Sequence, residues 1–133
     1  MKNFKRVLIT GGAQRIGSSI TKHLANKGFD VAIQYNKSHS NIDKLKTLLK
    51  TTNVKFKAFK FNFRKAKNYE GFFKKIKKDF GDIDILINNA SAFEFDSIKK
   101  TSHEIFDNHI DVNLKAPFFL SKCYVENLSL IHI

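Results

Sequence analysis

The sequence of 133 residues contains a single cysteine, Cys123, so an internal disulfide is excluded and a zinc site built on cysteines is not expected. Its five histidines show neither the H-E-x-x-H pattern nor any other paired spacing, which argues against a metal centre. No apolar run approaches the roughly 20 residues that a membrane-spanning helix needs. We therefore expect a cytoplasmic protein with no metal site and no membrane contact.

Acidic residues are also scarce, with 12 against 24 basic ones and a net charge of +12. Such a surplus raises the question of nucleic-acid binding. The lysines, however, alternate with apolar positions, as on a solvated surface, and arginine, which suits bidentate recognition, is rarely used. We expect no nucleic-acid partner, although a field this positive attracts an anionic cofactor.

Apolar patterning predicts short strands that alternate with helices. The predicted strands are 5–10, 29–35, 54–61, 83–87 and 128–133, and the predicted helices are 15–27, 38–49, 65–80 and a helical region from about 102 to 125. In the first helix, Ile16, Ile20 and Leu24 recur at fourfold spacing and indicate an apolar face. This alternation predicts an α/β fold in one domain over residues 1–133. The fold is a three-layer, Rossmann-type, doubly wound parallel sheet with strand order 3-2-1-4-5.

A glycine-rich turn, Thr10 to Gly17, joins the first predicted strand to the first helix. Glycine lets the backbone approach a ligand, and the start of a helix offers free N–H groups to a phosphate. The segment Asn88 to Ser91 follows the fourth strand and leaves the sheet at the same edge. Both segments therefore flank the crevice in which ligands bind in such folds.

The residues after the second strand bear on the choice of cofactor. A carboxylate about 20 residues beyond the glycines would accept hydrogen bonds from the ribose 2′-hydroxyl of NAD. Segment 34–38 has no carboxylate, and Lys37 and Ser38 stand there, with Arg15 in the glycine turn. Two cations and a hydroxyl suit a 2′-phosphate, so the sequence favours NADP(H); the alternative is that Arg15 and Lys37 are ordinary surface charges.

Three segments together resemble the short-chain dehydrogenase/reductase family. They are Thr10-Gly11-x-x-x-Arg15-Ile16-Gly17, Asn88-Asn89-Ala90-Ser91 and Asn113-Leu114-x-Ala116-Pro117-Phe118. The arginine in the turn, the serine of Asn-Asn-Ala-Ser and segment 34–38 resemble the pteridine-reductase branch. Members of that branch reduce pterins or dihydrofolate-like compounds with NADPH.

The resemblance implies roles for individual residues. Gly11, Arg15, Ile16 and Gly17 would bind the phosphates and ribose of the cofactor, and Lys37 and Ser38 would bind the 2′-phosphate. Asn62 and Phe63 would lie beside the adenine. Asn89, Ala90 and Ser91 would lie along the ribose. Asn113 matches the asparagine of the catalytic tetrad, which holds a water in a proton relay. Asn62 departs from the aspartate usual in the family, so it loses a charge but keeps a hydrogen-bonding side chain.

The other three tetrad members have no match in the sequence. In the family, a serine follows strand 5, and a Tyr-x-x-x-Lys pair lies on the next helix. The tyrosine donates the proton, and the lysine lowers the tyrosine pKa. Tyr124 is the nearest tyrosine, but Leu128 stands four residues beyond it. We therefore interpret the chain as truncated at Ile133 before these residues, without reductase turnover but with nucleotide affinity. Strand 128–133 would then be an open apolar edge that favours association.

Three functions follow from these observations. The first is an NADP(H)-dependent short-chain oxidoreductase of the carbonyl or pterin reductase type, inactive as given, with a small-molecule carbonyl or pterin substrate and assembly as a homo-oligomer. The second is a non-catalytic NADP(H)-binding or interaction module. The third, nucleic-acid binding, rests on the charge alone.

Overall fold

The computed structural model describes residues 5–132, and the side chains of residues 5–128. Four strands form its sheet: β1 (Arg6–Thr10), β2 (Asp30–Tyr35), β3 (Phe56–Lys60) and β4 (Ile85–Ile87). All neighbouring pairs are parallel, and the strand order is β3-β2-β1-β4. The parallel α/β class and this part of the predicted strand order are confirmed.

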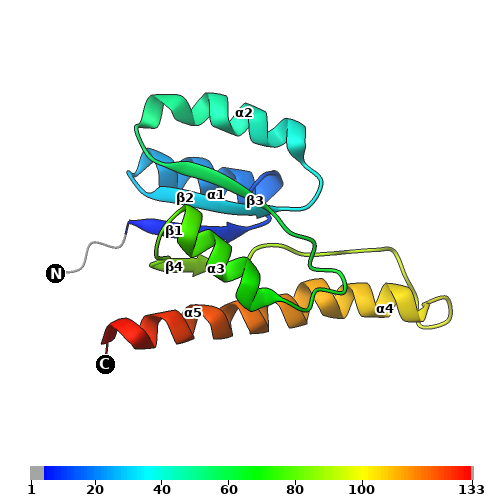
Figure 1. Cartoon of the computed structure of the whole chain (residues 1–133). Coiled ribbons are helices and arrows are strands. Elements are labelled where there is room, and N and C mark those ends of the chain that lie inside the picture. The colour runs from blue at the N-terminus through cyan, green and yellow to red at the C-terminus, as the bar shows by residue number, and fades with distance from the viewer. Residues whose placement is uncertain (1–4, 133) are drawn as a thin grey trace.

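Helices cover both faces of this sheet (Figure 1). They are α1 (Arg15–Asn26), α2 (His39–Leu49), α3 (Tyr69–Asp79), α4 (His103–Ile110) and α5 (Ala116–His132), with a 3-10 turn at Lys50–Thr52 and a π-helix, Asp111–Lys115, between α4 and α5. Helices α1 and α2 lie on one face, and α3 and α5 lie on the other. The chain therefore has the three layers of a doubly wound fold.

The alternation of side chains along β1 divides the core between the two faces. Val7 and Ile9 pack in the cluster under α1 and α2, whereas Leu8, between them, packs with α3 and α5. All three side chains are fully buried. A strand that is apolar in both phases is typical of a parallel sheet covered on both sides.

The apolar face expected for α1 is wrong in part. The residues of α1 that are buried are Gly17, Thr21 and Ala25, whereas Ile16 is 71% exposed. Ile20 and Leu24 are only partly buried at the margin of the core. Small side chains let α1 approach the sheet closely, so the larger ones are displaced to the sides of the contact.

The expected fifth strand is also wrong. Residues 128–132 belong to the end of α5, and Ile133 lies outside the described residues. No glycine or proline follows Pro117, so nothing in the sequence interrupts the helix. The open apolar edge expected at 128–133 is therefore absent from the described part of the chain, in which β4 is the last strand on its side of the sheet.

Helix α3 begins four residues later than expected. Asn68 is its N-cap, and the Asn68 side-chain oxygen accepts a hydrogen bond from the Gly71 N–H at 2.9 Å.

Among the described helices, none combines the length and the apolar character that a bilayer crossing requires.

Candidate functional site

The carboxyl ends of β1 and β4 meet at one edge of the sheet, where the glycine turn contacts the segment after β4. Gly11 has φ of +62°, and a Cβ there would lie 3.0 Å from the Ala90 Cα. A Cβ on Gly17 would lie only 1.9 Å from the Gly11 carbonyl oxygen and 2.7 Å from the Asn89 side-chain nitrogen. The two glycines are therefore required for the turn, the start of α1 and the segment after β4 to pack together.

Hydrogen bonds hold this junction. The Thr10 hydroxyl oxygen accepts from the Asn89 and Ala90 N–H groups at 3.0 and 2.9 Å. The Asn89 side-chain nitrogen donates to the carbonyl oxygens of Thr10 and Gly11 at 3.1 and 3.2 Å. The structure thus brings Gly11, Gly17, Asn89 and Ala90 together, and Ser91 follows them as an exposed residue.

Two buried polar residues that the sequence reasoning missed support the same turn. The Gln34 side-chain oxygen accepts from the Gly11 N–H at 2.9 Å, and its nitrogen donates to the Phe61 carbonyl at 2.7 Å. The Thr21 hydroxyl lies 3.0 and 2.9 Å from the carbonyl oxygens of Gly12 and Gly17. The available signal for Gln34 was a polar residue within an otherwise apolar strand, because a buried amide needs partners.

The start of α1 is suited to an anion. Its first residue is Arg15, no side chain caps its N-terminus, and no acidic residue stands in its first turn. The first N–H groups of a helix without a cap, together with the helix dipole, attract a phosphate. Arg15 is exposed and has φ of +51°, a left-handed conformation that is uncommon for a residue with a side chain.

The residues expected to hold a 2′-phosphate lie between β2 and α2. Lys37 is exposed, and Ser38 is the N-cap residue of α2, but its hydroxyl makes no capping hydrogen bond. Among the described residues, neither Arg15 nor Lys37 forms an ion pair. Arg15 at the start of α1, and Lys37 and Ser38 after β2, are thus not committed to other charged groups.

The two residues expected beside an adenine differ in their surroundings. Asn62 is exposed, and its side-chain oxygen accepts from the Arg64 N–H at 3.0 Å. Phe63 is only 4% exposed, because its ring packs in the core and contacts the Phe61 ring edge-on. The Phe63 ring is therefore part of the core, and contact with an adenine would have to use the Phe63 backbone.

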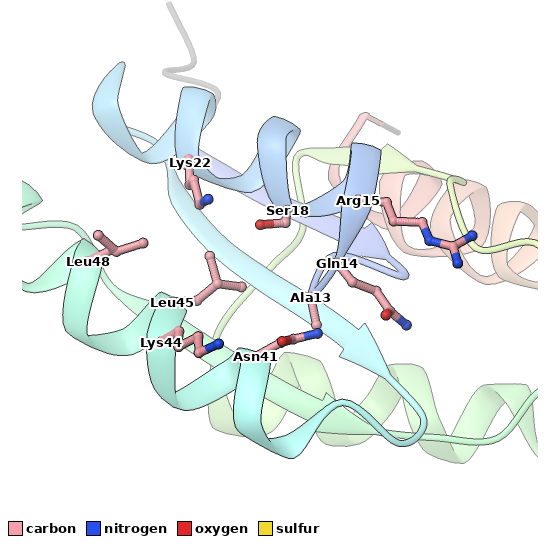
Figure 2. A pocket seen from close by; sticks show the side chains of 9 residues that line it. All are labelled: Ala13, Gln14, Arg15, Ser18, Lys22, Asn41, Lys44, Leu45 and Leu48. Carbon is pink, nitrogen blue, oxygen red and sulfur yellow. The ribbon is translucent and has the colours of Figure 1, made fainter.

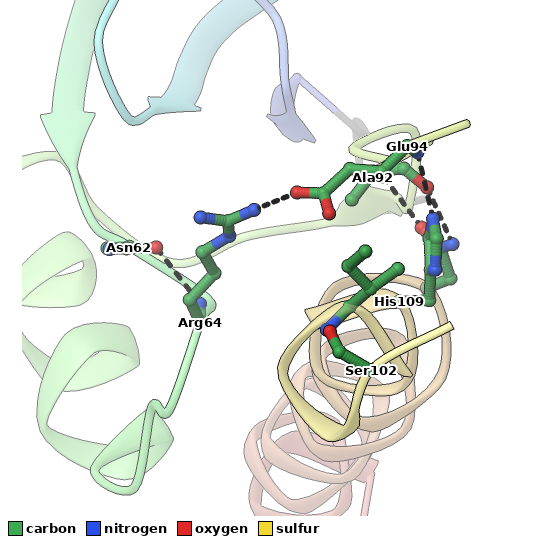
Figure 3. A network of polar contacts seen from close by, with 8 residues as sticks. Asn62, Arg64, Ala92, Glu94, Ser102 and His109 are labelled. Carbon is green, nitrogen blue, oxygen red and sulfur yellow. Dashed lines mark hydrogen bonds and ion pairs between the residues drawn. The ribbon is translucent and has the colours of Figure 1, made fainter. Parts of the chain in front are cut away.

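Polar contacts fasten the loop that follows β4 (Figure 3). The Glu94 carboxylate forms an ion pair with Arg64, and the Glu94 N–H donates to His109 Nε2 at 2.9 Å. The Asn113 side chain accepts from the Ala92 N–H at 2.8 Å and donates to the Ala92 carbonyl at 2.9 Å. Asn113 therefore positions the loop through both ends of its amide, and it does so from a π-helix, a feature frequent at functional sites.

Tyr124 belongs to α5, and Tyr69 of α3 packs against it. Neither tyrosine is placed as a proton donor for this crevice. The Tyr124 hydroxyl donates to the Asp84 carbonyl at 2.6 Å, which fastens α5 to the residue before β4. Tyr69 is buried against Phe119, and burial, with the negative charge of Asp111, raises the pKa of its hydroxyl. Burial likewise raises the pKa of the Cys123 thiol, which disfavours the reactive thiolate.

A comparison with protein families decides the family. A family model described as short chain dehydrogenase matches residues 5–130. The chain belongs to this family. The resemblance drawn from the glycine turn, the Asn-Asn-Ala-Ser segment and the segment around Asn113 is thereby confirmed.

Curated members of the short chain dehydrogenase family share about a third of the residues. The chain is 31% identical over 118 residues to the 3-oxoacyl-acyl-carrier-protein reductase FabG of Staphylococcus aureus, which covers 89% of this chain and 48% of that protein. It is 37% identical over 127 residues to an uncharacterized oxidoreductase of Thermotoga maritima, which covers 93% of this chain and 48% of that protein. The chain thus spans about half the length of these relatives.

Solved structures of the family have the same fold. The FolM alternative dihydrofolate reductase 1 of Brucella suis, crystallised in complex with NADP, superposes with a TM-score of 0.85 and 31% identity over 93% of this chain and 51% of that one. A short chain dehydrogenase of Burkholderia cenocepacia, also in complex with NADP, gives 0.85 and 30% over 92% and 50%. Structural neighbours of this fold are therefore known with NADP bound.

Proposed function

We propose that residues 1–133 form an NADP(H)-binding domain, with the cofactor lying across the carboxyl ends of β1 and β4. The observation that carries this proposal is the uncapped start of α1 at Arg15, together with Lys37 after β2; neither cation has an ion-pair partner in the described structure. The dinucleotide phosphates would face the glycine turn and the start of α1. The 2′-phosphate would lie between Arg15, Lys37 and Ser38.

The other expected site residues fit this placement. Asn89 and Ala90 hold the segment after β4 against the turn. Ser91, which follows them, would then border the ribose. Asn62 and the Phe63 backbone would border the adenine, and Ile16 would border the cofactor from the exposed side of α1. Bound NADPH supplies a hydride, while the chain's own residues bind and orient it.

We propose that the reaction served by this domain is the reduction of a small-molecule carbonyl or pterin. The likeness to an alternative dihydrofolate reductase supports a flat heteroaromatic substrate. Phe93, two residues beyond Ser91, is largely exposed and offers an aromatic face against which such a ring can stack. The Asn113 side chain holds Ala92, the residue between these two, in place.

We expect residues 1–133 to bind NADPH at least about tenfold more tightly than NADH, which lacks the 2′-phosphate, and to show no NADPH oxidation with pterin or ketone substrates. Asn113 is the one tetrad residue matched in this sequence, and the Tyr124 hydroxyl is engaged by the Asp84 carbonyl. Titration calorimetry measures the two affinities, and NADPH absorbance measures turnover. Equal affinities would contradict the selectivity, no binding would contradict the nucleotide site, and turnover would contradict the inactivity.

A homo-oligomer is also proposed, because α4 and α5 expose a stripe of large apolar side chains. The stripe consists of Phe106, Ile110, Leu114, Phe118 and Val125. Leu114, Phe118 and Val125 line a shallow groove of about 570 Å³. Large apolar side chains that recur along one exposed helical stretch are typical of an interaction site. The same stripe favours the second candidate function, an interaction module that binds NADP(H) without catalysis.

Replacing Phe118 by lysine is expected to weaken self-association at least about tenfold, because a charge would then be buried in the interface. Sedimentation velocity over a range of concentrations measures the association. Phe95→Lys is the matched control, since Phe95 is the same residue type and is even more exposed, at 93% against 64% for Phe118, but lies on the loop after β4. A wild-type chain that stays monomeric at every concentration would rule out assembly through this stripe.

A further inference from the structure

A groove between α1 and α2 lies on the sheet face opposite α3 and α5, and Arg15 is the only residue of its lining that the nucleotide proposal uses. Its volume is about 250 Å³. Ala13, Leu45 and Leu48 form the apolar part of its lining, and polar side chains line the rest. It is lined by three cations, Arg15, Lys22 and Lys44, and by no acidic residue. A concave site with cations alone focuses a positive potential on its interior.

Lys22 and Ser18 come from α1, and Lys44 and Asn41 come from α2, on opposite sides of this groove (Figure 2). The ammonium groups of Lys22 on α1 and Lys44 on α2 both turn toward the space between the helices. The Ser18 hydroxyl and the Asn41 amide also turn toward this space. The Arg15 guanidinium, in contrast, extends away from the groove past the start of α1, which leaves it available to the nucleotide site.

The charges of the groove are not neutralised within the chain. Neither Lys22 nor Lys44 forms an ion pair in the described structure, although other lysines there do, such as Lys77 with Asp82. Two like charges across a narrow groove repel each other, and an anion between them removes that repulsion. Hydroxyl and amide groups supply the hydrogen bonds that a phosphate oxygen accepts.

We propose that the groove between α1 and α2 is a second anion site, which binds a phosphate group through Lys22 and Lys44 with hydrogen bonds from Ser18 and Asn41. The ligand is free inorganic phosphate, because the 2′-phosphate of the cofactor is already assigned to Arg15, Lys37 and Ser38 and the Arg15 guanidinium points away from the groove. The site is defined by side chains that the nucleotide proposal does not require, so the two proposals can be tested separately.

The test is a titration of the 133-residue chain with sodium phosphate, followed by the amide NMR signals of Ala13, Ser18 and Asn41. Sodium chloride at matched ionic strength is the reference. We expect a saturable shift with a dissociation constant of about 1–10 mM, the range of a site with two cations open to water. A shift that does not saturate, or that chloride reproduces, would mean solvated surface lysines and would overturn the proposal.

Paired variants identify the groups responsible. Lys22→Gln with Lys44→Gln is expected to raise the dissociation constant at least about tenfold, whereas Lys27→Gln with Lys46→Gln leaves it within about twofold. The control pair removes the same charge from the same α1–α2 region but from exposed positions outside the groove. Equal effects of the two pairs would overturn the assignment to Lys22 and Lys44.

A nucleotide fragment tests whether the groove is separate from the nucleotide site. If 2′,5′-ADP competes with inorganic phosphate and is weakened by the Lys22 and Lys44 variants while 5′-ADP is not, the groove is part of the nucleotide site and the proposal of a second site is overturned. If both ligands bind together, the groove takes free phosphate. Saturable phosphate binding without any binding of 2′,5′-ADP would leave this site intact and contradict the proposed nucleotide function.

Discussion

Replacing Gly17 by alanine is expected to lower the free energy of unfolding by about 3 kcal/mol and to abolish nucleotide binding. An added Cβ would lie 1.9 Å from the Gly11 carbonyl oxygen and 2.8 Å from the Gly11 carbonyl carbon. These are backbone atoms, so the turn itself would have to move. Alanine normally stabilises a helix by about 1 kcal/mol relative to glycine, so the whole loss is steric. Urea unfolding measures the stability, and calorimetry measures the binding.

Gly28→Ala is the matched control for this prediction. Gly28 follows α1 with φ of +92°, and a Cβ added there would have no other atom within 4 Å. Its substitution therefore costs only the backbone strain, about 1 kcal/mol, and leaves nucleotide affinity unchanged. If the two variants lost the same stability, the close packing of α1 against the glycine turn would not be the cause.

Replacing Arg15 by glutamate is expected to weaken NADPH binding at least about 100-fold while changing NADH binding less than about fivefold. The substitution puts a negative charge where the 2′-phosphate is proposed to lie, and Arg15 has no acidic partner in the described structure whose loss would complicate the result. Calorimetry with the two cofactors gives the ratio. Equal losses for both cofactors would place Arg15 away from the 2′-phosphate.

Arg15→Gly separates the charge of this residue from its backbone. The φ of +51° is strained for arginine and relaxed for glycine, so this variant should be as stable as the parent or up to about 1 kcal/mol more stable. Its NADPH affinity should still fall about tenfold. A loss of stability would show that the side chain has a structural role, which its exposure does not suggest.

The sequence predicted the arrangement of the sheet because the strands are short, β1 and β2 are apolar in both phases, and segments with helical spacing separate the strands. It placed Gly11, Gly17, Asn89 and Ala90 correctly at one junction, since parallel strands that leave one edge bring their following segments together. These are properties of local pattern and of topology, and both can be read without knowing any side-chain position.

The errors arise where packing overrides periodicity. Ile16 matches the apolar spacing of α1, yet the close approach of Gly17 and Thr21 to the sheet turns it outward. The end of α5 reads as a strand because Leu128, Leu130 and Ile131 are apolar, but no breaking residue separates them from the helix before. The roles of Gln34 and of the Asn113 amide depend on partners 27 and 21 residues away, which no local pattern reveals.

Gln34 also connects the glycine turn to the aromatic core on the far face of the sheet. Its amide joins the Gly11 N–H to the Phe61 carbonyl, and the Phe61 ring stacks on Phe72 of α3 with centroids 4.2 Å apart. The turn cannot leave its place without stranding a buried amide, at a cost of about 1–3 kcal/mol. The turn is therefore linked through Gln34 to the aromatic core on the far face of the sheet, and opening the turn alone would break that link.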